Sequence, residues 1–250
     1  MNEQLKQLLI NRLTALADDE LILAHRDSEW TGYGPILEED IALSNISQDE
    51  LGHATVIYGL VEALTGTTPD RMAFFRDADA FLNAQLVELP RGDWAFTMLR
   101  QYLFDTYEHV LLTAVSTSLY QPLADAVAKF RGEEMYHLRH THVWVERLGI
   151  GTIESNGRMQ DALDTLWPYT AQLFNPMPGE EQLIEAGYFP NVSLLKEKWE
   201  QIVLPHLETS ELSIPNTAPV LAPRSQHTPH LEDLLADMQK VARWDPQAEW

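Results

Sequence analysis

The motif Glu-x-x-His occurs twice in this chain, and each copy follows a single acidic residue at nearly the same distance. The first acid stands 30 residues before its motif and the second stands 29 residues before its own. In chain order, these residues are Glu20, Glu50, His53, Asp105, Glu134 and His137. Four carboxylates and two imidazoles in this order are the ligands of a di-iron or di-manganese four-helix bundle. The pattern therefore predicts an all-α fold around a four-helix bundle.

The spacing places each acid opposite its motif across a helical hairpin. Residues equally distant from the turn of an antiparallel hairpin lie at the same height. The midpoint of Glu20 and Glu50 is Pro35, inside a Gly-Tyr-Gly-Pro break, and the second midpoint falls beside Tyr120, two residues before Pro122. Both pairs are then about 15 residues, or roughly 22 Å of helix, from their turns. The six ligands are expected deep in the bundle.

The ligands also lie on apolar helix faces. Residues three apart on a helix face the same way, so each Glu-x-x-His presents two ligands to one site. A charged group on an apolar face is costly unless it is paired or metal-bound. Asp49 and Glu133 each precede a ligand Glu, and we expect them to orient the metal-bound imidazoles through hydrogen bonds.

Two alternatives remain open at this point. The same groups could form a buried polar network without metal, and Glu108, one turn from Asp105, could replace it as the ligand from the third helix. The chain has no cysteine, so a metal would use His and carboxylates, which suit iron or manganese.

The hydrophobic pattern predicts one domain over residues 1–250. Residues 1–150 form the four-helix core, and residues 151–250 add further helices and an irregular extension. Four prolines favour irregular chain over 209–229. The helices are expected at 3–30, 36–65, 70–76, 93–118, 122–148, 155–174, 192–208 and 230–243.

Composition restricts the partners and the compartment. A net charge of −21 makes nucleic acid and anionic membranes poor partners. Neither a signal peptide nor a transmembrane helix is expected, and the lack of cysteine fits the cytoplasm. The chain lacks the sequence fingerprints of flavin and nicotinamide sites, and we expect no flavin, nicotinamide or haem to be bound. Electrons must then come from another protein.

Several segments resemble the family of C-type subunits of bacterial phenylacetyl-CoA epoxidases, the PaaC type. The resemblance covers nearly the whole chain. No single segment is diagnostic of the family, but the combination of segments is specific to it. It rests on residues 28–32, 37–46, 100–102, 136–139, 144–149, 166–167 and 238–250.

This resemblance implies a ferritin-like fold and a role in a multicomponent monooxygenase. Such an enzyme converts phenylacetyl-CoA to its ring 1,2-epoxide with oxygen and electrons from a flavin and iron–sulfur reductase. The resemblance implies that the catalytic di-iron site belongs to the A-type subunit. The C-type subunit is implied to be its structural partner, typically with a degraded metal site. This chain departs from that pattern, because all six ligands are present.

Three functional hypotheses follow. The first is a non-catalytic partner of the A-type subunit, in a complex that also holds a B-type subunit and a reductase; alone, the chain could form a homodimer. The second is a di-iron oxygenase or oxidase with its own metal site. The third is iron storage, which needs a cage-forming surface that the sequence does not indicate. We favour the first, with a complete or vestigial di-metal site in the same chain.

Overall fold

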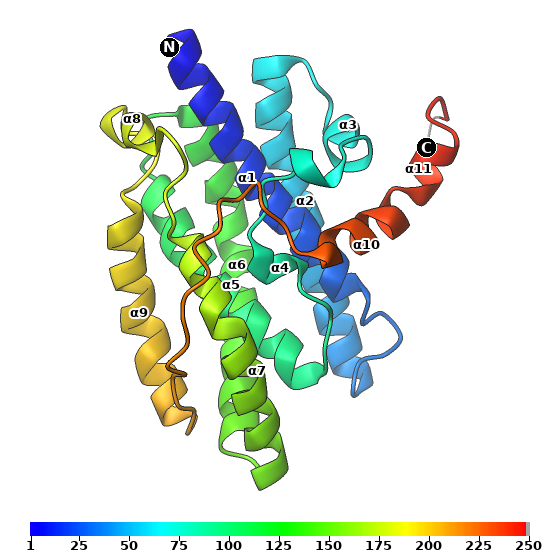
Figure 1. Cartoon of the computed structure of the whole chain (residues 1–250), viewed down its shortest axis with the longest axis vertical. Coiled ribbons are helices and arrows are strands. Elements are labelled where there is room, and N and C mark those ends of the chain that lie inside the picture. Colours follow the sequence, from blue (N-terminus) through cyan, green and yellow to red (C-terminus); the bar gives the residue numbers. More distant parts are fainter. Residues whose placement is uncertain (249–250) are drawn as a thin grey trace. The chain divides into compact units, whose positions relative to one another are not determined.

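Helices joined by turns and irregular chain make up the computed structural model, which describes residues 1–248 and contains no strand within that range (Figure 1). The all-α class is confirmed, and the helices agree with a ferritin-like arrangement of long hairpins plus added helices. The elements are α1 (Glu3–Ser28), α2 (Leu37–Thr65), α3 (Pro69–Phe74), the 3₁₀ turn η1 (Ala78–Ala80), α4 (Gln85–Glu88), α5 (Trp94–Val115), α6 (Gln121–Gly149), α7 (Ile153–Leu173), α8 (Glu180–Glu185), α9 (Val192–Thr209), α10 (Pro229–Met238) and α11 (Lys240–Trp244).

Most helix bounds were predicted to within a few residues. The four ligand-bearing helices, the short helix after Pro69 and the helices at 153–173 and 192–209 were all expected. The irregular chain between α9 and α10 was also expected, whereas the short α4, α8 and η1 were missed because a single turn leaves no periodic pattern. The last two residues of the segment that carries the family resemblance, 249 and 250, lie outside the described residues.

The described chain divides into two compact units. The first unit contains residues 1–90 and the segment from Pro223 onward, so it holds α1 to α4, η1, α10 and α11. The second unit contains Arg91–Ala222 and holds α5 to α9. Each unit is built around one long helical hairpin. The single-domain arrangement of the sequence analysis stays a prediction.

In the first unit, α1 and α2 form a hairpin (Figure 1), which is held by contacts in its turn and by hydrogen bonds between the two helices. The Asp40 carboxylate accepts hydrogen bonds from the backbone N–H groups of Gly32 and Gly34, with N···O distances of 2.8 and 3.1 Å. Gly32 has a φ of +82°, a conformation that glycine adopts without strain. The Ser47 hydroxyl donates to the Ala24 carbonyl oxygen at 2.8 Å. These contacts set the register of α2 against α1. The bond between Ser47 and Ala24 lies about one helical turn from Glu50 and Glu20.

The hairpin of the second unit is held at both ends. Near its open end, the rings of Trp94 and Trp144 meet edge to face with centroids 5.6 Å apart. Near its turn, the Ser118 hydroxyl donates to the Tyr188 carbonyl oxygen at 2.8 Å. In the middle, the buried Trp199 of α9 donates from its indole N–H to the Leu103 carbonyl oxygen at 3.0 Å. The added helices therefore hold α5 in place.

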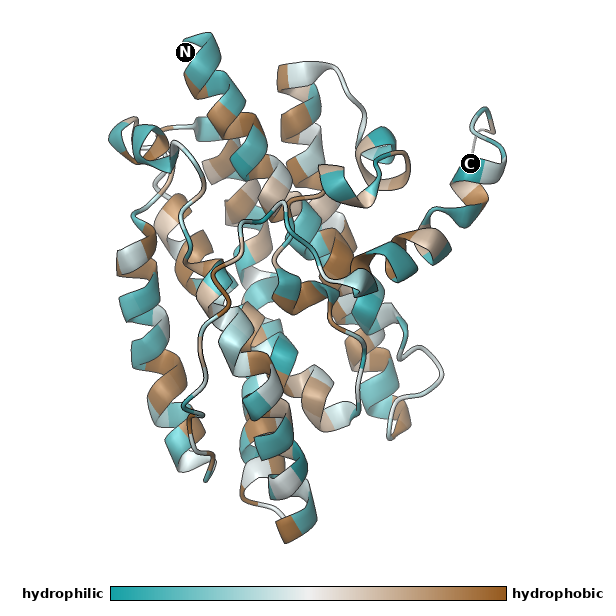
Figure 2. Cartoon of the chain, viewed as in Figure 1, coloured by the Kyte–Doolittle hydropathy of each residue, from teal (hydrophilic) through white to brown (hydrophobic). Residues whose placement is uncertain are grey.

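The added helices are amphipathic, as expected for elements that cover a hairpin. Figure 2 shows hydrophilic and hydrophobic residues interleaved along both α7 and α9. Their buried positions include Met159, Leu163 and Leu166 on α7 and Leu195 and Val203 on α9. Across residues 1–248, none of the helices combines the length and the apolar composition needed to cross a bilayer.

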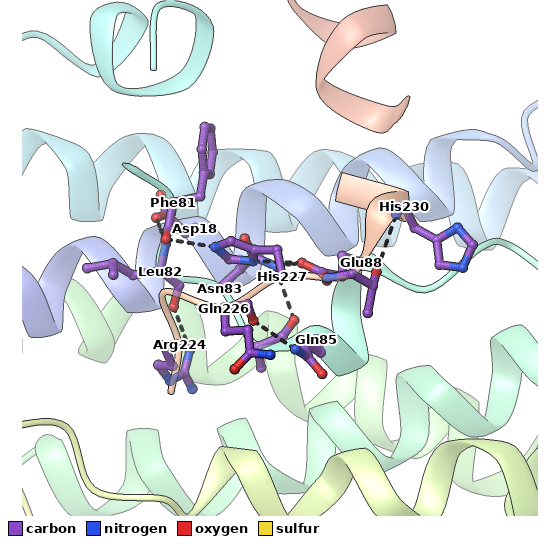
Figure 3. A network of polar contacts seen from close by, with 12 residues as sticks. Asp18, Phe81, Leu82, Asn83, Gln85, Glu88, Arg224, Gln226, His227 and His230 are labelled. Atoms are coloured by element: carbon purple, nitrogen blue, oxygen red, sulfur yellow. Dashed lines mark hydrogen bonds and ion pairs between the residues drawn. The ribbon is translucent and has the colours of Figure 1, made fainter. Parts of the chain in front are cut away.

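The segment after Pro223 returns to the first unit through buried polar contacts (Figure 3). The Arg224 guanidinium pairs with the Asp19 carboxylate at 2.7 Å, and both side chains are at least 95% buried. The His227 ring lies between the Glu88 carboxylate and the Phe81 carbonyl oxygen, 2.9 Å from each. We call residues 223–230 the return segment; it leads directly into α10.

Candidate metal centre

Glu20, Glu50 and His53 form what we call the N-terminal ligand set, on α1 and α2 of the first unit. Their exposed fractions are 3%, 0% and 2%. Glu20 lies near the buried Leu16, Ala17, Leu23 and Ala24 of α1 and directly follows two other buried acids. Burial of three ionisable groups in one helix pair requires compensation from polar partners or from a cation.

Asp105, Glu134 and His137 form the corresponding central ligand set, on α5 and α6 of the second unit. Their exposed fractions are 0%, 1% and 0%. Glu134 and His137 are three residues apart on α6, as the motif requires. Each ligand set thus consists of two buried carboxylates and one buried imidazole from one hairpin.

Two carboxylate–imidazole distances fit ligands that share an ion. The Nδ1 atom of His53 lies 3.6 Å from Oε2 of Glu20, and Nδ1 of His137 lies 3.5 Å from Oε1 of Glu134. Two ligand atoms each about 2.1 Å from one metal ion lie about 3.0 to 3.4 Å apart, depending on the coordination angle. The observed distances exceed that range only slightly, and they exceed the usual length of an N–H···O hydrogen bond. Nitrogen and oxygen donors of these types suit iron or manganese.

The carboxylate of Asp105 is held from two sides. Its Oδ1 accepts a hydrogen bond from Gln101 Nε2 at 2.8 Å, and its Oδ2 accepts one from Thr141 Oγ1 at 2.7 Å. Gln101 precedes Asp105 by one helical turn on α5, whereas Thr141 belongs to α6. The sequence analysis missed both partners. Their only sequence signal is spacing, since Gln101 lies four residues before Asp105 and Thr141 four residues after His137.

The choice between Asp105 and Glu108 remains a prediction. Both side chains are buried on α5, with exposed fractions of 0% and 4%. The bond from Thr141 aims Asp105 at α6, the helix that carries Glu134 and His137. We therefore keep Asp105 as the third-helix ligand.

The two outer carboxylates differ in their surroundings. Asp49 is half-buried on α2, whereas Glu133 is exposed on α6. A hydrogen bond from a metal-bound imidazole is favoured by a buried acceptor, so Asp49 is the better candidate of the two. Their predicted role in orienting the histidines stays a prediction.

A small hollow beside Glu134 limits what this part of the second unit can admit. It has a volume of about 20 Å³ and is lined by His109, Leu112, Thr113, Arg131, Glu134 and Met135. Such a volume holds about one water molecule. Pockets for drug-sized ligands have volumes of about 300 to 1,000 Å³. The hollow therefore admits water but not a drug-sized organic molecule.

Known proteins resemble this chain over most or all of its length. A family model described as "Phenylacetic acid catabolic protein" matches residues 1–250. The C-type component of the 1,2-phenylacetyl-CoA epoxidase of Escherichia coli (strain K12) is 38% identical over 248 residues, which cover 96% of this chain and 100% of that protein. The A-type component of the same epoxidase is 24% identical over 176 residues, which cover 70% of this chain and 57% of that component.

Proposed function

Because this chain belongs to the family of phenylacetic acid catabolic proteins, we propose that it is the C-type subunit of a phenylacetyl-CoA epoxidase. Its main role is to act as the structural partner of the catalytic A-type subunit, in a complex that also includes a B-type subunit and a reductase. The observation that carries this proposal is the 38% identity to the C-type component of such an epoxidase, over the full length of that relative.

The negative charge of the chain supports the proposal that the A-type subunit, and not this chain, binds the substrate. Coenzyme A carries several negative charges, and a chain with a net charge of −21 repels such a ligand over long distances. The small hollow beside Glu134 also lacks the volume for the substrate. Binding of the thioester is then the task of the partner subunit.

Association with the A-type subunit is the direct test. We expect the chain, co-expressed with the A-type subunit of its own source, to elute with it as one complex during size-exclusion chromatography. We also expect phenylacetyl-CoA-dependent oxygen uptake, with the B-type subunit and reductase present, to require this chain. Separate elution of the two subunits, together with full oxygen uptake in the absence of this chain, would contradict the proposal.

We further propose that the N-terminal and central ligand sets join in one di-metal centre. The support is chemical: each set is buried, contains two carboxylates and one imidazole, and lies midway along a hairpin. When bound, two iron ions would supply the binding and reduction of dioxygen. The second candidate function, a di-iron oxygenase or oxidase, depends on this centre.

Metal content decides whether the centre exists. We expect close to two iron or manganese ions per chain in protein produced in metal-rich medium. The change Glu50→Gln should remove at least one ion, because it removes a charged ligand while keeping the shape of the side chain. The matched control Glu62→Gln lies on the same helix and should keep both ions. The proposed centre is wrong if the unmodified chain holds only trace metal, measured by elemental analysis.

A further inference from the structure

The carboxylates of Asp105 and Glu20 differ in their polar contacts. Each of its two oxygens accepts a hydrogen bond, from Gln101 at 2.8 Å and from Thr141 at 2.7 Å. All three side chains are completely buried. The polar contact of Glu20 is instead with the imidazole of His53, at 3.6 Å. Asp105 and Glu20, the acids that precede the two Glu-x-x-His motifs, therefore differ in these contacts.

The hydroxyl group of Thr141 has one hydrogen and three acceptors within reach. Asp105 Oδ2 lies at 2.7 Å, the carbonyl oxygen of His137 at 3.0 Å and that of Leu138 at 3.3 Å. A hydrogen bond to an ionised carboxylate is shorter and stronger than one to a carbonyl group. The hydrogen therefore points to Asp105. Through this bond, the turn of α6 that carries His137 also holds the ligand on α5.

We propose that Thr141 and Gln101 are positioning residues that hold the Asp105 carboxylate in its metal-binding orientation. This inference rests on the proposed di-metal centre. Each carboxylate oxygen has two lone pairs, so one can accept a hydrogen bond while the other coordinates an ion. Asp is one methylene shorter than Glu and has less reach, so a rotation of its side chain would withdraw the carboxylate from a bound ion.

The effect should fall on one ion of the two. Neither Thr141 nor Gln101 belongs to the first unit, and both contact the carboxylate of the central ligand set. Loss of an outer partner of this kind typically weakens metal binding about 10- to 100-fold. The ion held by the N-terminal ligand set should keep its affinity.

A cobalt titration of the full-length chain tests the proposal. Co²⁺ is added to metal-free protein, and binding of each ion is followed by visible absorption and by isothermal titration calorimetry. Thr141→Val removes the hydroxyl group but keeps the branched shape, and it should weaken one ion about 10- to 100-fold. Thr141→Ser keeps the hydroxyl group and should restore binding to within a few-fold of the unmodified chain.

The matched control is Thr170→Val. Thr170 is also buried in the second unit, and its hydroxyl group donates to the Trp167 carbonyl oxygen of its own helix at 2.8 Å. This variant also loses a buried threonine hydroxyl group, but it should bind both ions as the unmodified chain does. Gln101→Leu tests the other oxygen of Asp105 and serves in place of Thr141→Val if that variant does not fold, as judged by circular dichroism.

Two results would overturn the inference, and they are distinguishable. If the unmodified chain binds two ions and Thr141→Val or Gln101→Leu binds both with unchanged affinity, the positioning role is wrong while the di-metal centre stands. If the unmodified chain binds no Co²⁺, the proposed centre fails and the positioning role fails with it.

Discussion

His206 shows how a single residue acquires unusual chemistry from its neighbours. Its ring stacks on His142 with centroids 3.5 Å apart and an angle of 15° between the planes. The Tyr102 ring lies 4.9 Å away on a third helix. Burial, with a smaller contribution from the adjacent His142, lowers the pKa of His206 to about 4. The ring therefore stays neutral in this cluster at neutral pH.

This lowered pKa predicts a loss of stability in mild acid. The folded chain binds a proton at His206 less readily than the unfolded chain, whose His pKa is about 6.5. The stabilisation is therefore present above pH 6.5 and is lost as the pH falls towards 4. Between pH 7 and 5 we expect the free energy of unfolding to fall by about 1 kcal/mol through this residue, after a discount for solvent screening.

Urea unfolding at pH 7 and pH 5 measures this contribution. His206→Phe keeps an aromatic ring beside His142 and Tyr102 but has no proton to gain, so its midpoint should change less between the two pH values. The control His230→Phe alters a half-buried histidine of the first unit, outside this cluster. An unchanged pH response in His206→Phe would show that the ring is not the titrating group.

At the scale of an element, the return segment depends on His227. Both ring nitrogens face acceptors, because Glu88 Oε2 lies 2.9 Å from Nδ1 and the Phe81 carbonyl oxygen lies 2.9 Å from Nε2. The Glu88 carboxylate also accepts hydrogen bonds from Asn83 and from the Thr228 backbone N–H. An imidazole that donates at both nitrogens carries both hydrogens and is therefore a cation.

The pKa of His227 agrees with this geometry. Burial lowers the pKa, but the hydrogen bonds to Glu88 and Phe81 and the charges of Glu88 and Asp18 outweigh it, so that the pKa is raised above its usual 6.5. The stabilisation that protonated His227 gives to the return segment is then fully present below pH 6.5. It is lost as the pH rises through the raised pKa. The neighbouring charge of Arg224 is compensated by its ion pair with Asp19.

Hydrogen exchange of the backbone amides of residues 226–228 and 230 checks this behaviour. After correction for the intrinsic exchange rate, their protection should fall several-fold between pH 6 and pH 9 as the ring loses its proton. His227→Gln has a neutral side chain and should show low protection at both pH values, whereas His230→Gln should follow the unmodified chain. Protection that is independent of pH in the unmodified chain would contradict the prediction.

At the scale of the whole molecule, acidic residues outnumber basic residues by 38 to 17. Some acidic groups lie inside the units, among them both ligand sets and the partners of Arg224 and His227. Such groups need compensation within the fold, and a pair of divalent cations would neutralise four of them. The remaining acidic surface disfavours an anionic ligand.

The two units also differ in how continuous they are in the chain. The second unit is one uninterrupted stretch, whereas the first is completed by residues more than 130 positions away from it. Arg224 and His227 reach Asp19 and Glu88 across separations of 205 and 139 residues. The hydrophobic pattern along the chain does not predict such contacts, because it reports only neighbours within a few helical turns.

The helices, the two hairpins and the family could be read from the amino-acid sequence alone, which also predicts the six candidate ligands. These follow from local rules: apolar periodicity selects helices, glycine and proline end them, and three-residue spacing puts Glu and His on one face. The donors that hold Asp105, the acceptors that raise the pKa of His227 and the burial that lowers the pKa of His206 became visible in the folded structure alone. Each of those effects includes at least one group that is distant in the sequence, and packing alone brings such groups within hydrogen-bonding or ring-stacking distance.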